Sequence, residues 1–479
     1  MELYEKIKDV LSKKGVNILV TNIYDYMEMW KSWYKGNVKD FHFYNVVVNG
    51  KRVQKERLTM NMPKKICEDI SKLLWTEKTK IELSSKNSTK RLWEVLDSKK
   101  NSFTINFPIF IEKSLALGTG VLIEYKNSDD ETIIDYVYGD MVIPYKYTNS
   151  YISGLVTISR FIEKGKKNIY YTHITYHEFD GKVYRRYNEL YKSTDETELG
   201  KEVDFNEKFS DVKQLEEIKT SIPRFQVFKP NLANNLDLSS PMGISVLANS
   251  IDRFKSLDTK FDSFYNEFKL GKKRILVDPS AMKASMQSDI DGNVRYVQYF
   301  DTNDEVYIGI NGMENQPVKD VDFTLRANEH IESINADLNW LSSNIGLGNN
   351  FYKFNGTGVK TATEVMSENA DAFRTKVHYD IITNDVIYDL VKVICEMENI
   401  KTNRITIIPD DSIIEDKNAE QMRALQEVAQ GLRSKLSYLT EVKGLTEQEA
   451  QEELEKITEE KQENVANFFN SDNANVGDE

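Results

Sequence analysis

The chain has 479 residues, 40% of them hydrophobic and 11% aromatic, which is enough apolar material for about two to four domains and excludes wholesale disorder. Its two cysteines, Cys67 and Cys395, exclude a disulfide framework or a four-ligand zinc site built from them. The net charge of −13 argues against a protein that coats nucleic acid through bulk electrostatics.

Hydropathy and the N-terminal residues argue against a membrane or secretory role. No stretch approaches about 18 consecutive apolar residues, so no membrane-spanning helix is expected. Residues 1–10 lack the basic and then apolar layout of a signal peptide. We therefore expect a soluble protein of a reducing compartment.

The acidity is concentrated at one end of the chain. Residues 447–479 hold eleven acidic side chains against two lysines, a net charge of −9, so the other 446 residues together carry −4. The body of the protein is therefore nearly neutral.

The first hundred residues combine helical patterns with a short strand pair. Residues 23–34 carry aromatic side chains near helical spacing, and Pro63 begins another helix. Between them, residues 41–48 alternate in polarity, Asn49-Gly50 is a turn signal, and residues 52–58 predict the returning strand. Three tryptophans are expected to pack in the core: Trp30, Trp33 and Trp75.

A predicted helix over residues 103–117 leads into a β-rich region. From residue 121 to about 226, short strand-like runs are separated by Gly, Asn and Asp turns, which is the pattern of an antiparallel meander. His173 and His177 would lie on one strand face, two pleats apart, but no third ligand accompanies them. The pattern therefore does not favour a zinc site.

Two long helices are predicted to flank a small β insert. Residues 244–270 contain no Gly or Pro and repeat apolar side chains every three or four positions, which predicts a helix about 40 Å long. Residues 274–317 contain three strand-like runs, and residues 325–343 are helical again. The first helix ends in a basic cluster that suits a helix C-terminus: Lys269, Lys272, Lys273 and Arg274.

The remaining third of the chain is mainly helical. A loop containing four glycines precedes a long predicted helix over residues 361–398, and residues 405–408 predict a short strand. A further helix is predicted over residues 416–439. Thr446 and Glu449 then have the spacing of a capping box at the start of another helix.

Two loops resemble phosphate cradles, and neither has the required context. Gly118-Thr-Gly120 follows a helix and precedes a strand, the reverse of the order in a dinucleotide-binding fold. Residues 356–361 precede a helix but lack the adjacent Gly-Lys pair and the preceding strand of a P-loop. Since no nucleophile elbow, Cys/His cluster or Asp-rich metal motif is present, we expect no catalytic residue, no cofactor, no metal and no enzyme activity.

Three blocks of the sequence resemble the portal proteins of tailed bacteriophages, particularly the siphovirus type of Gram-positive hosts. They are residues 240–277 (SPMGISVLANSIDRFKSLDTKFDSFYNEFKLGKKRILV), 115–125 (LALGTGVLIEY) and 360–376 (KTATEVMSENADAFRTK). Their order and spacing also fit this family, and the resemblance covers essentially the whole chain.

The resemblance implies an α+β subunit with a β-rich wing, long stem helices flanking a β clip, and a helical C-terminal crown. The implied segments are the wing with its helical N-terminus (1–239), the first stem helix (240–270), the clip (271–318), the second stem helix (319–343), the tunnel loop (344–360), a long wing helix (361–400), and the crown with the acidic tail (401–479).

The resemblance also implies where DNA would be met. Glycines give the tunnel loop backbone freedom, and its lysines would touch passing phosphates: Gly346, Gly348, Lys353, Gly356, Gly358 and Lys360. The basic cluster near the stem–clip junction would face a partner. Alternatively, it would form ion pairs with acidic residues of a neighbouring subunit, namely Asp252, Asp258, Asp262 or Glu267.

The implied function is that of a ring at one capsid vertex, through which double-stranded DNA passes during packaging and ejection. The implied partners are a homo-oligomer of about twelve subunits, sequence-independent double-stranded DNA, the large terminase subunit, a head-completion or adaptor protein, and the major capsid and scaffold proteins, with no membrane. The implied location is the virion, and the host cytoplasm during assembly. Two alternatives are open: a nucleic-acid-processing phage enzyme (ATPase or nuclease), and a minor capsid protein without a channel.

Overall fold

The computed structural model describes most of the chain, with gaps concentrated in the predicted insert and at the C-terminal end. The described residues are 2–16, 22–48, 50–210, 212–271, 274–277, 284–288, 294–298, 307–309, 318–321, 324–354, 362–410, 417–446 and 448–458. The chain divides into two compact units. The first comprises residues 1–358 and 371–409, and the second comprises residues 359–370 and 410–479.

Six helices lie in the N-terminal part of the first unit: α1 (Glu2–Lys13), α2 (Ile23–Tyr34), α3 (Lys39–His42), α4 (Met62–Leu74), α5 (Lys86–Leu96) and α6 (Phe103–Leu117). The helices predicted from residue 23, from Pro63 and over residues 103–117 are confirmed. Helix α6 ends at Gly118, whose φ of +79° is the left-handed conformation in which glycine avoids strain.

The three tryptophans pack in the main hydrophobic core, as predicted. Trp30 and Trp33 project from α2, and Trp75 caps α4 against the edges of the Phe103 and Phe107 rings. All five rings are buried. Burial of such large side chains supplies much of the hydrophobic stabilisation of this unit.

The β-rich region forms two sheets rather than one meander. Strands β4 (Gly120–Lys126), β5 (Thr132–Tyr138) and β12 (Phe225–Phe228) form a three-stranded sheet in the order β12-β4-β5. The second sheet has the order β10-β9-β8-β7-β6, with β11 also paired to β9; its strands are β6 (Val142–Thr148), β7 (Tyr151–Glu163), β8 (Ile169–Phe179), β9 (Val183–Ser193), β10 (Lys201–Val203) and β11 (Leu215–Lys219).

The predicted antiparallel pairing of neighbouring strands is therefore confirmed for β4 with β5 and for β6 to β10. The expectation of a single meander is wrong, because β4, β5 and β12 form a separate sheet. A short 3₁₀ turn, Gly139–Met141, separates β5 from β6, and the chain changes sheets there. Two other pairs are smaller. Strand β1 (Phe43–Val48) pairs with β2 (Lys51–Glu56), as the hairpin pattern predicted, and β3 (Lys80–Leu83) pairs with β18 (Ile405–Ile408).

The long helix predicted from residue 244 begins later than its apolar repeat suggests. Helix α7 spans Ile251–Leu270, about 30 Å, after a 3₁₀ turn at Ala248–Ser250. The preceding segment is buried in a non-helical conformation. Its Val246 amide donates to the Leu115 carbonyl at 3.1 Å, and its Gly243 amide donates to the Thr119 hydroxyl at 3.1 Å. Tertiary packing, not helix formation, explains the apolar residues at its start.

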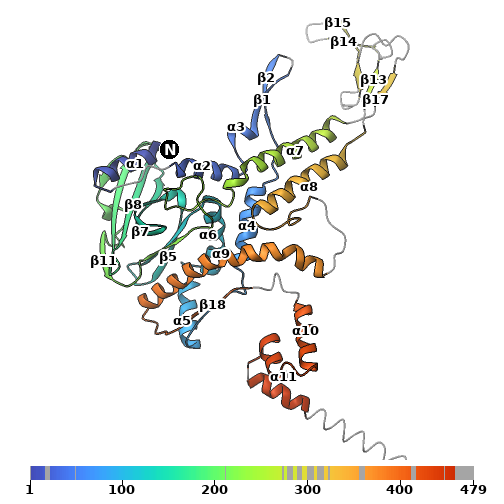
Figure 1. Cartoon of the computed structure of the whole chain (residues 1–479). Helices are drawn as coiled ribbons and strands as arrows, with labels where there is room; N and C mark the ends of the chain where they lie inside the picture. The colour runs from blue at the N-terminus through green and yellow to red at the C-terminus, as the bar shows by residue number, and fades with distance from the viewer. Residues whose placement is uncertain are drawn as a thin grey trace, which may run out of the picture. The chain divides into compact units, whose positions relative to one another are not determined.

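The insert after α7 contains β strands, as predicted. They are β13 (Arg274–Val277), β14 (Ala284–Ser288), β15 (Val294–Gln298), β16 (Tyr307–Gly309) and β17 (Val318–Val321). Strand β13 lies between β16 and β17, and β14 pairs with β15. Helix α8 (Ala327–Asn344) follows, and Figure 1 shows it beside α7.

Helix α9 spans Ala362–Met397, close to the predicted range. In the second unit, the helix predicted over residues 416–439 is wrong beyond α10 (Lys417–Ala429), because Gly431 adopts a φ of +74° and breaks it. A short helix α11 (Lys435–Ser437) and a π-helical turn (Tyr438–Val442) follow. The capping box is confirmed, since the Thr446 amide donates to Glu449 Oε2 at 2.9 Å and the Glu449 amide donates to Thr446 Oγ1 at 3.3 Å.

Candidate channel segments and subunit contacts

Helices α7 and α8 form an antiparallel pair with a buried apolar seam. Phe254 and Leu257 of α7 and three side chains of α8 belong to the main core: Ile334, Leu338 and Leu341. Polar contacts reinforce the seam, because Asp337 of α8 accepts from Ser256 at 2.5 Å and pairs with Lys260 at 2.8 Å. The two helices therefore act as one stiff unit.

The far end of this pair is closed by an arginine fork. Arg326, just before α8, donates from Nε and Nη2 to the two carboxylate oxygens of Glu267 in α7, at 3.0 and 2.8 Å. These bonds lower the pKa of Glu267 to about 2. His330 lies 3.8 Å from the same carboxylate. The fork therefore fixes the C-terminal end of α7 against the N-terminal end of α8, the two helix ends that the β insert connects.

The acidic residues of α7 are largely engaged within their own chain. Asp258 is buried 3.1 Å from His42 Nε2, and Glu267 is held by Arg326. Asp262 accepts from the Leu58 amide at 3.2 Å, and exposed Asp252 lies 3.2 Å from Lys255. Asp258 therefore cannot be one of the acids that pair with the basic cluster of a neighbouring subunit, because a buried carboxylate is inaccessible to a second subunit.

The basic cluster is only partly described. Lys269 is exposed in the last turn of α7, 5.9 Å from the centre of the Tyr265 ring. Arg274 begins strand β13, opposite Val321 of β17. Lys272 and Lys273 lie outside the described residues, and the role of the cluster stays a prediction.

The described part of the predicted tunnel loop is a packed turn. Gly346 and Gly348 adopt φ values of +81° and +82°, Leu347 between them is buried, and Thr375 Oγ1 of α9 donates to the Gly346 carbonyl at 2.5 Å. Tyr352 is buried too, and its hydroxyl donates to Asp69 at 3.0 Å. The two glycines thus serve a fixed left-handed conformation, whereas the sequence had suggested backbone freedom.

Lys353 follows this turn and is half-buried. Gly356, Gly358 and Lys360 lie outside the described residues. A contact of Lys353 or Lys360 with DNA stays a prediction.

The Gly118-Thr-Gly120 turn is filled by protein atoms. A Cβ at Gly118 would lie 2.5 Å from the Ile244 backbone carbon, and one at Gly120 would lie 1.9 Å from Ser114 Oγ. The turn joins α6 to β4, which confirms the predicted helix-before-strand order. It has no room for a phosphate.

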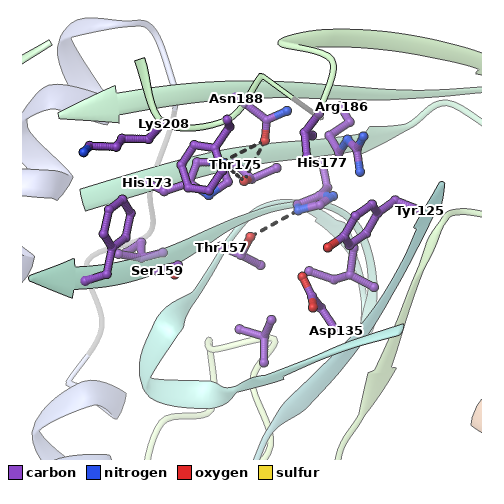
Figure 2. Close-up of a pocket in the computed structure, with 16 residues that line it drawn as sticks. Tyr125, Asp135, Thr157, Ser159, His173, Thr175, His177, Arg186, Asn188 and Lys208 are labelled. Carbon is purple, nitrogen blue, oxygen red and sulfur yellow. Dashed lines mark hydrogen bonds between the residues drawn. The ribbon is translucent and has the colours of Figure 1, made fainter. Parts of the chain in front are cut away.

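A cavity of about 450 Å³ lies in the β-rich part, and His173 and His177 both line it (Figure 2). Burial lowers the pKa of His173, and it lowers the pKa of His177 well below the usual range, so both imidazoles are neutral near pH 7. His173 Nε2 lies 3.0 Å from Asn188 Oδ1, and His177 bonds Thr157 at 3.2 Å and Tyr184 at 2.8 Å.

Two cationic side chains of the cavity wall are paired inside the protein. Arg186 contacts Glu216 at 3.0 Å, and Lys208 contacts Glu163 at 2.9 Å. Among the described residues no group bonds the Arg186 Nε, but this atom is itself buried, so the cavity cannot offer it to a ligand. Among the described residues no group of three His, Cys, Asp or Glu side chains could hold a metal ion.

Sequence reasoning missed the contact between His42 and Asp258. The Val38 amide donates to His42 Nδ1 at 2.9 Å, so His42 is protonated on Nε2 and donates to Asp258. Asp258 also accepts from the Met60 amide at 2.8 Å. No local signal marks this contact, because its two residues lie 216 positions apart.

Two further observations bear on the class of protein. Cys67 and Cys395 are both free and buried. Within the described ranges, no helix combines the length and the apolar character needed to cross a membrane.

One comparison with known proteins decides the family. The model of the family described as "Phage portal protein, SPP1 Gp6-like" matches residues 20–466, which is nearly the whole chain. The chain belongs to this family. No curated protein matches the chain.

Family membership confirms the portal-like α+β subunit and the portal function that the three sequence blocks suggested. It implies an oligomeric ring at a capsid vertex, with the capsid, the terminase and DNA as partners. Portal proteins of this family are generally structural rather than enzymatic.

Proposed function

We propose that this portal protein assembles into a ring of about twelve copies that conducts double-stranded DNA during packaging and ejection. The order of elements supports the proposal. Helix α7, the β insert, α8, the loop from residue 344 and α9 follow one another as a first stem helix, a clip, a second stem helix, a tunnel loop and a wing helix would.

In this proposal the segments keep the bounds that the resemblance implies, with α7 and α8 as the helical parts of the stem. We assign residues 1–239 to the wing, 240–270 and 319–343 to the stem, 271–318 to the clip, 344–360 to the tunnel loop, 361–400 to the long wing helix and 401–479 to the crown. The stiffness of the α7–α8 pair supports a stem, because a channel wall must keep its width under load.

DNA contacts in this proposal are few and weak. Lys353 and Lys360 meet passing phosphates, and a sparse set of lysines suits a cargo that must slide, since each neutralised phosphate adds to the affinity. The nearly neutral body, −4 over 446 residues, also suits a conduit that does not hold its cargo.

The clip, with the basic cluster at its base, docks the large terminase subunit and later a head-completion protein. Other surfaces meet the major capsid and scaffold proteins during assembly in the host cytoplasm. No ATPase or nuclease activity is expected of the chain, and the phage host type stays a prediction.

The native mass of the purified protein tests this proposal. Twelve copies of 55.5 kDa come to about 666 kDa, and negatively stained particles should show rings with a central hole wide enough for duplex DNA. A ring without such a hole would favour the minor capsid protein. ATP hydrolysis that Lys360→Ala abolishes would overturn the proposal in favour of an enzyme.

A further inference from the structure

The β1–β2 hairpin, residues 43–56, has one fully exposed strand, β2. Every described residue of β2 is exposed, and exposed apolar side chains include Val47 at 70% and Val53 at 43%. Among the strands that the structure describes, β1 and β2 pair only with each other, and Figure 1 shows the hairpin extending away from α3. A lone two-stranded hairpin with two open edges is at best marginally stable in water and invites a partner.

One face of the hairpin is apolar with a basic border. The register pairs Val46 with Val53 and Tyr44 with Lys55, so these four side chains share a face. In the part of the chain that the structure describes, neither Val46 nor Val53 belongs to a hydrophobic cluster. Core packing within the subunit therefore does not account for the apolar side chains on this face of the hairpin.

The base of the hairpin, in contrast, is firmly fixed to α7. His42, directly before β1, is buried against Asp258, and the Leu58 amide after β2 donates to Asp262. Arg57 closes the two strands: its amide donates to the His42 carbonyl at 2.7 Å, and its guanidinium lies 4.1 Å from the centre of the Phe41 ring. The hairpin is thus held in a set direction relative to α7, as a docking element would be.

We propose that the β1–β2 hairpin docks on the neighbouring copy of the chain and helps to close the ring. This inference rests on ring formation in the proposed function, which supplies a second copy at a fixed position beside each hairpin. Charge favours the same partner. The hairpin carries Lys51, Arg52 and Lys55 against Glu56, a net +2, so the rest of the −13 chain carries −15. A second copy is therefore acidic overall, with −9 in residues 447–479 and −6 in the rest of the chain outside the hairpin, and its net charge attracts a basic, apolar-faced hairpin.

A charged substitution on the exposed face tests the docking. Val53→Asp should leave the subunit folded, because Val53 is exposed and touches no core cluster. The substitution should lower the fraction of protein in rings by about tenfold at a fixed low concentration, because each subunit interface of the ring would have to bury the charged side chain that replaces Val53. Native mass spectrometry measures that fraction, and circular dichroism checks the fold.

The matched control is Leu215→Asp, the same change of an exposed apolar side chain on strand β11. The control should assemble like the unmodified protein. If the unmodified protein is a monomer, ring formation itself fails, independently of the hairpin. If the unmodified protein and Val53→Asp form rings equally well, only the hairpin proposal is overturned.

A photocrosslinking amino acid at position 53 identifies what the hairpin touches. Irradiated rings should yield a dimer-sized product whose linked peptide comes from a second copy of the chain. Absence of that product from intact rings overturns the proposal. Unchanged assembly of Val53→Asp with weakened binding of duplex DNA also overturns it, and would assign the hairpin to DNA instead.

Discussion

Glu124 on strand β4 is buried without a hydrogen-bond partner for either carboxylate oxygen among the described residues. Burial raises its pKa well above the usual range, although the charge of Arg224 opposes the shift. That arginine is already paired with Glu396 at 2.9 Å, and the Gln226 amide donates to the Pro223 carbonyl at 3.0 Å. Glu124 is therefore protonated in the folded protein at a pH where it is ionised in the unfolded chain.

This shift predicts a pH-dependent stability. Because the folded pKa lies above the unfolded value near 4.5, the folded state is favoured below that value and loses stability as the pH rises towards the folded pKa. Glu124→Gln removes the titration and keeps the shape. It should raise the melting temperature at pH 8 by about 2 °C or more and change it little at pH 5, as measured by differential scanning calorimetry.

Two comparisons make the Glu124 experiment specific. Neutral, buried His173 and His177 contribute an opposite trend, stability lost below about pH 6.5, but they do so in both proteins. Glu131→Gln changes a glutamate whose pKa is lowered by Lys100, and it should not stabilise the protein at pH 8. A lower melting temperature for Glu124→Gln at pH 8 would show instead that Glu124 is ionised against Arg224.

At the residue scale, the sequence predicts burial better than pairing. The core tryptophans and both cysteines are apolar enough for their burial to be predicted from local pattern. Arg224, whose charge acts on Glu124, and the partners of His42 and Asp258 lie far away in the sequence, and no spacing rule predicts these neighbours. For that reason the contacts that fix the base of the hairpin could be identified only from the structure.

At the scale of elements, the turn after α8 depends on a glycine. Gly346 has a φ of +81°, and a Cβ there would lie 2.6 Å from Thr375 Oγ1, which cannot rotate away without losing its bond to the Gly346 carbonyl. Gly346→Ala should therefore destabilise the protein by about 2 kcal/mol or more in thermal unfolding, from backbone strain plus the clash.

Gly181→Ala separates the two causes. Gly181 has a φ of +92° in the turn after β8, but nothing lies within 4 Å of its added Cβ. In this variant only the backbone strain should lower the free energy of unfolding, by on the order of 1 kcal/mol. Equal losses in the two variants would show that Thr375 yields, and that the turn after α8 is more adaptable than its contacts indicate.

Element types were predicted well where one periodicity ran without interruption. Helices α6, α8 and α9 and strands β13, β15 and β16 of the insert occur where their patterns predicted them, whereas β14 and β17 were not predicted. The errors arose where tertiary contacts imitate or end a pattern. The apolar residues before Ile251 pack against the end of α6 in a non-helical conformation, and Gly431 ends α10 inside a continuous helical pattern.

For the whole molecule, the order of elements and the family could be predicted, and the division of strands between sheets could not. Strand β4 pairs with β12, about a hundred residues later, while β6 to β9 pair with their sequence neighbours. The strands of both sheets show the same local alternation of apolar and polar residues, so this pattern does not indicate which strands pair. The proposed channel is a further step, because it forms between copies, and a single sequence specifies only the surfaces that meet.

Charge is the property of the whole chain that most directly affects DNA. Residues 447–479 concentrate −9, whereas the remaining 446 residues disperse −4. A dense acidic segment repels duplex DNA over about one Debye length, near 10 Å at 0.1 M salt. In a ring, every copy adds such a segment, so the repulsion increases with assembly.

Replacing the six acidic residues of 459–479 with amides tests this repulsion at constant length, because it changes the net charge from −13 to −7. The assembled variant should bind duplex DNA about tenfold more tightly at 50 mM salt, and the difference should disappear at high salt. Fluorescence anisotropy measures both affinities.

The matched control neutralises six dispersed, exposed acids of the first unit: Glu5, Asp9, Asp25, Glu77, Asp129 and Glu196. Because these six lie scattered, the control should gain less affinity; an equal gain would show that net charge alone, and not its concentration at one end, keeps the portal from binding its cargo.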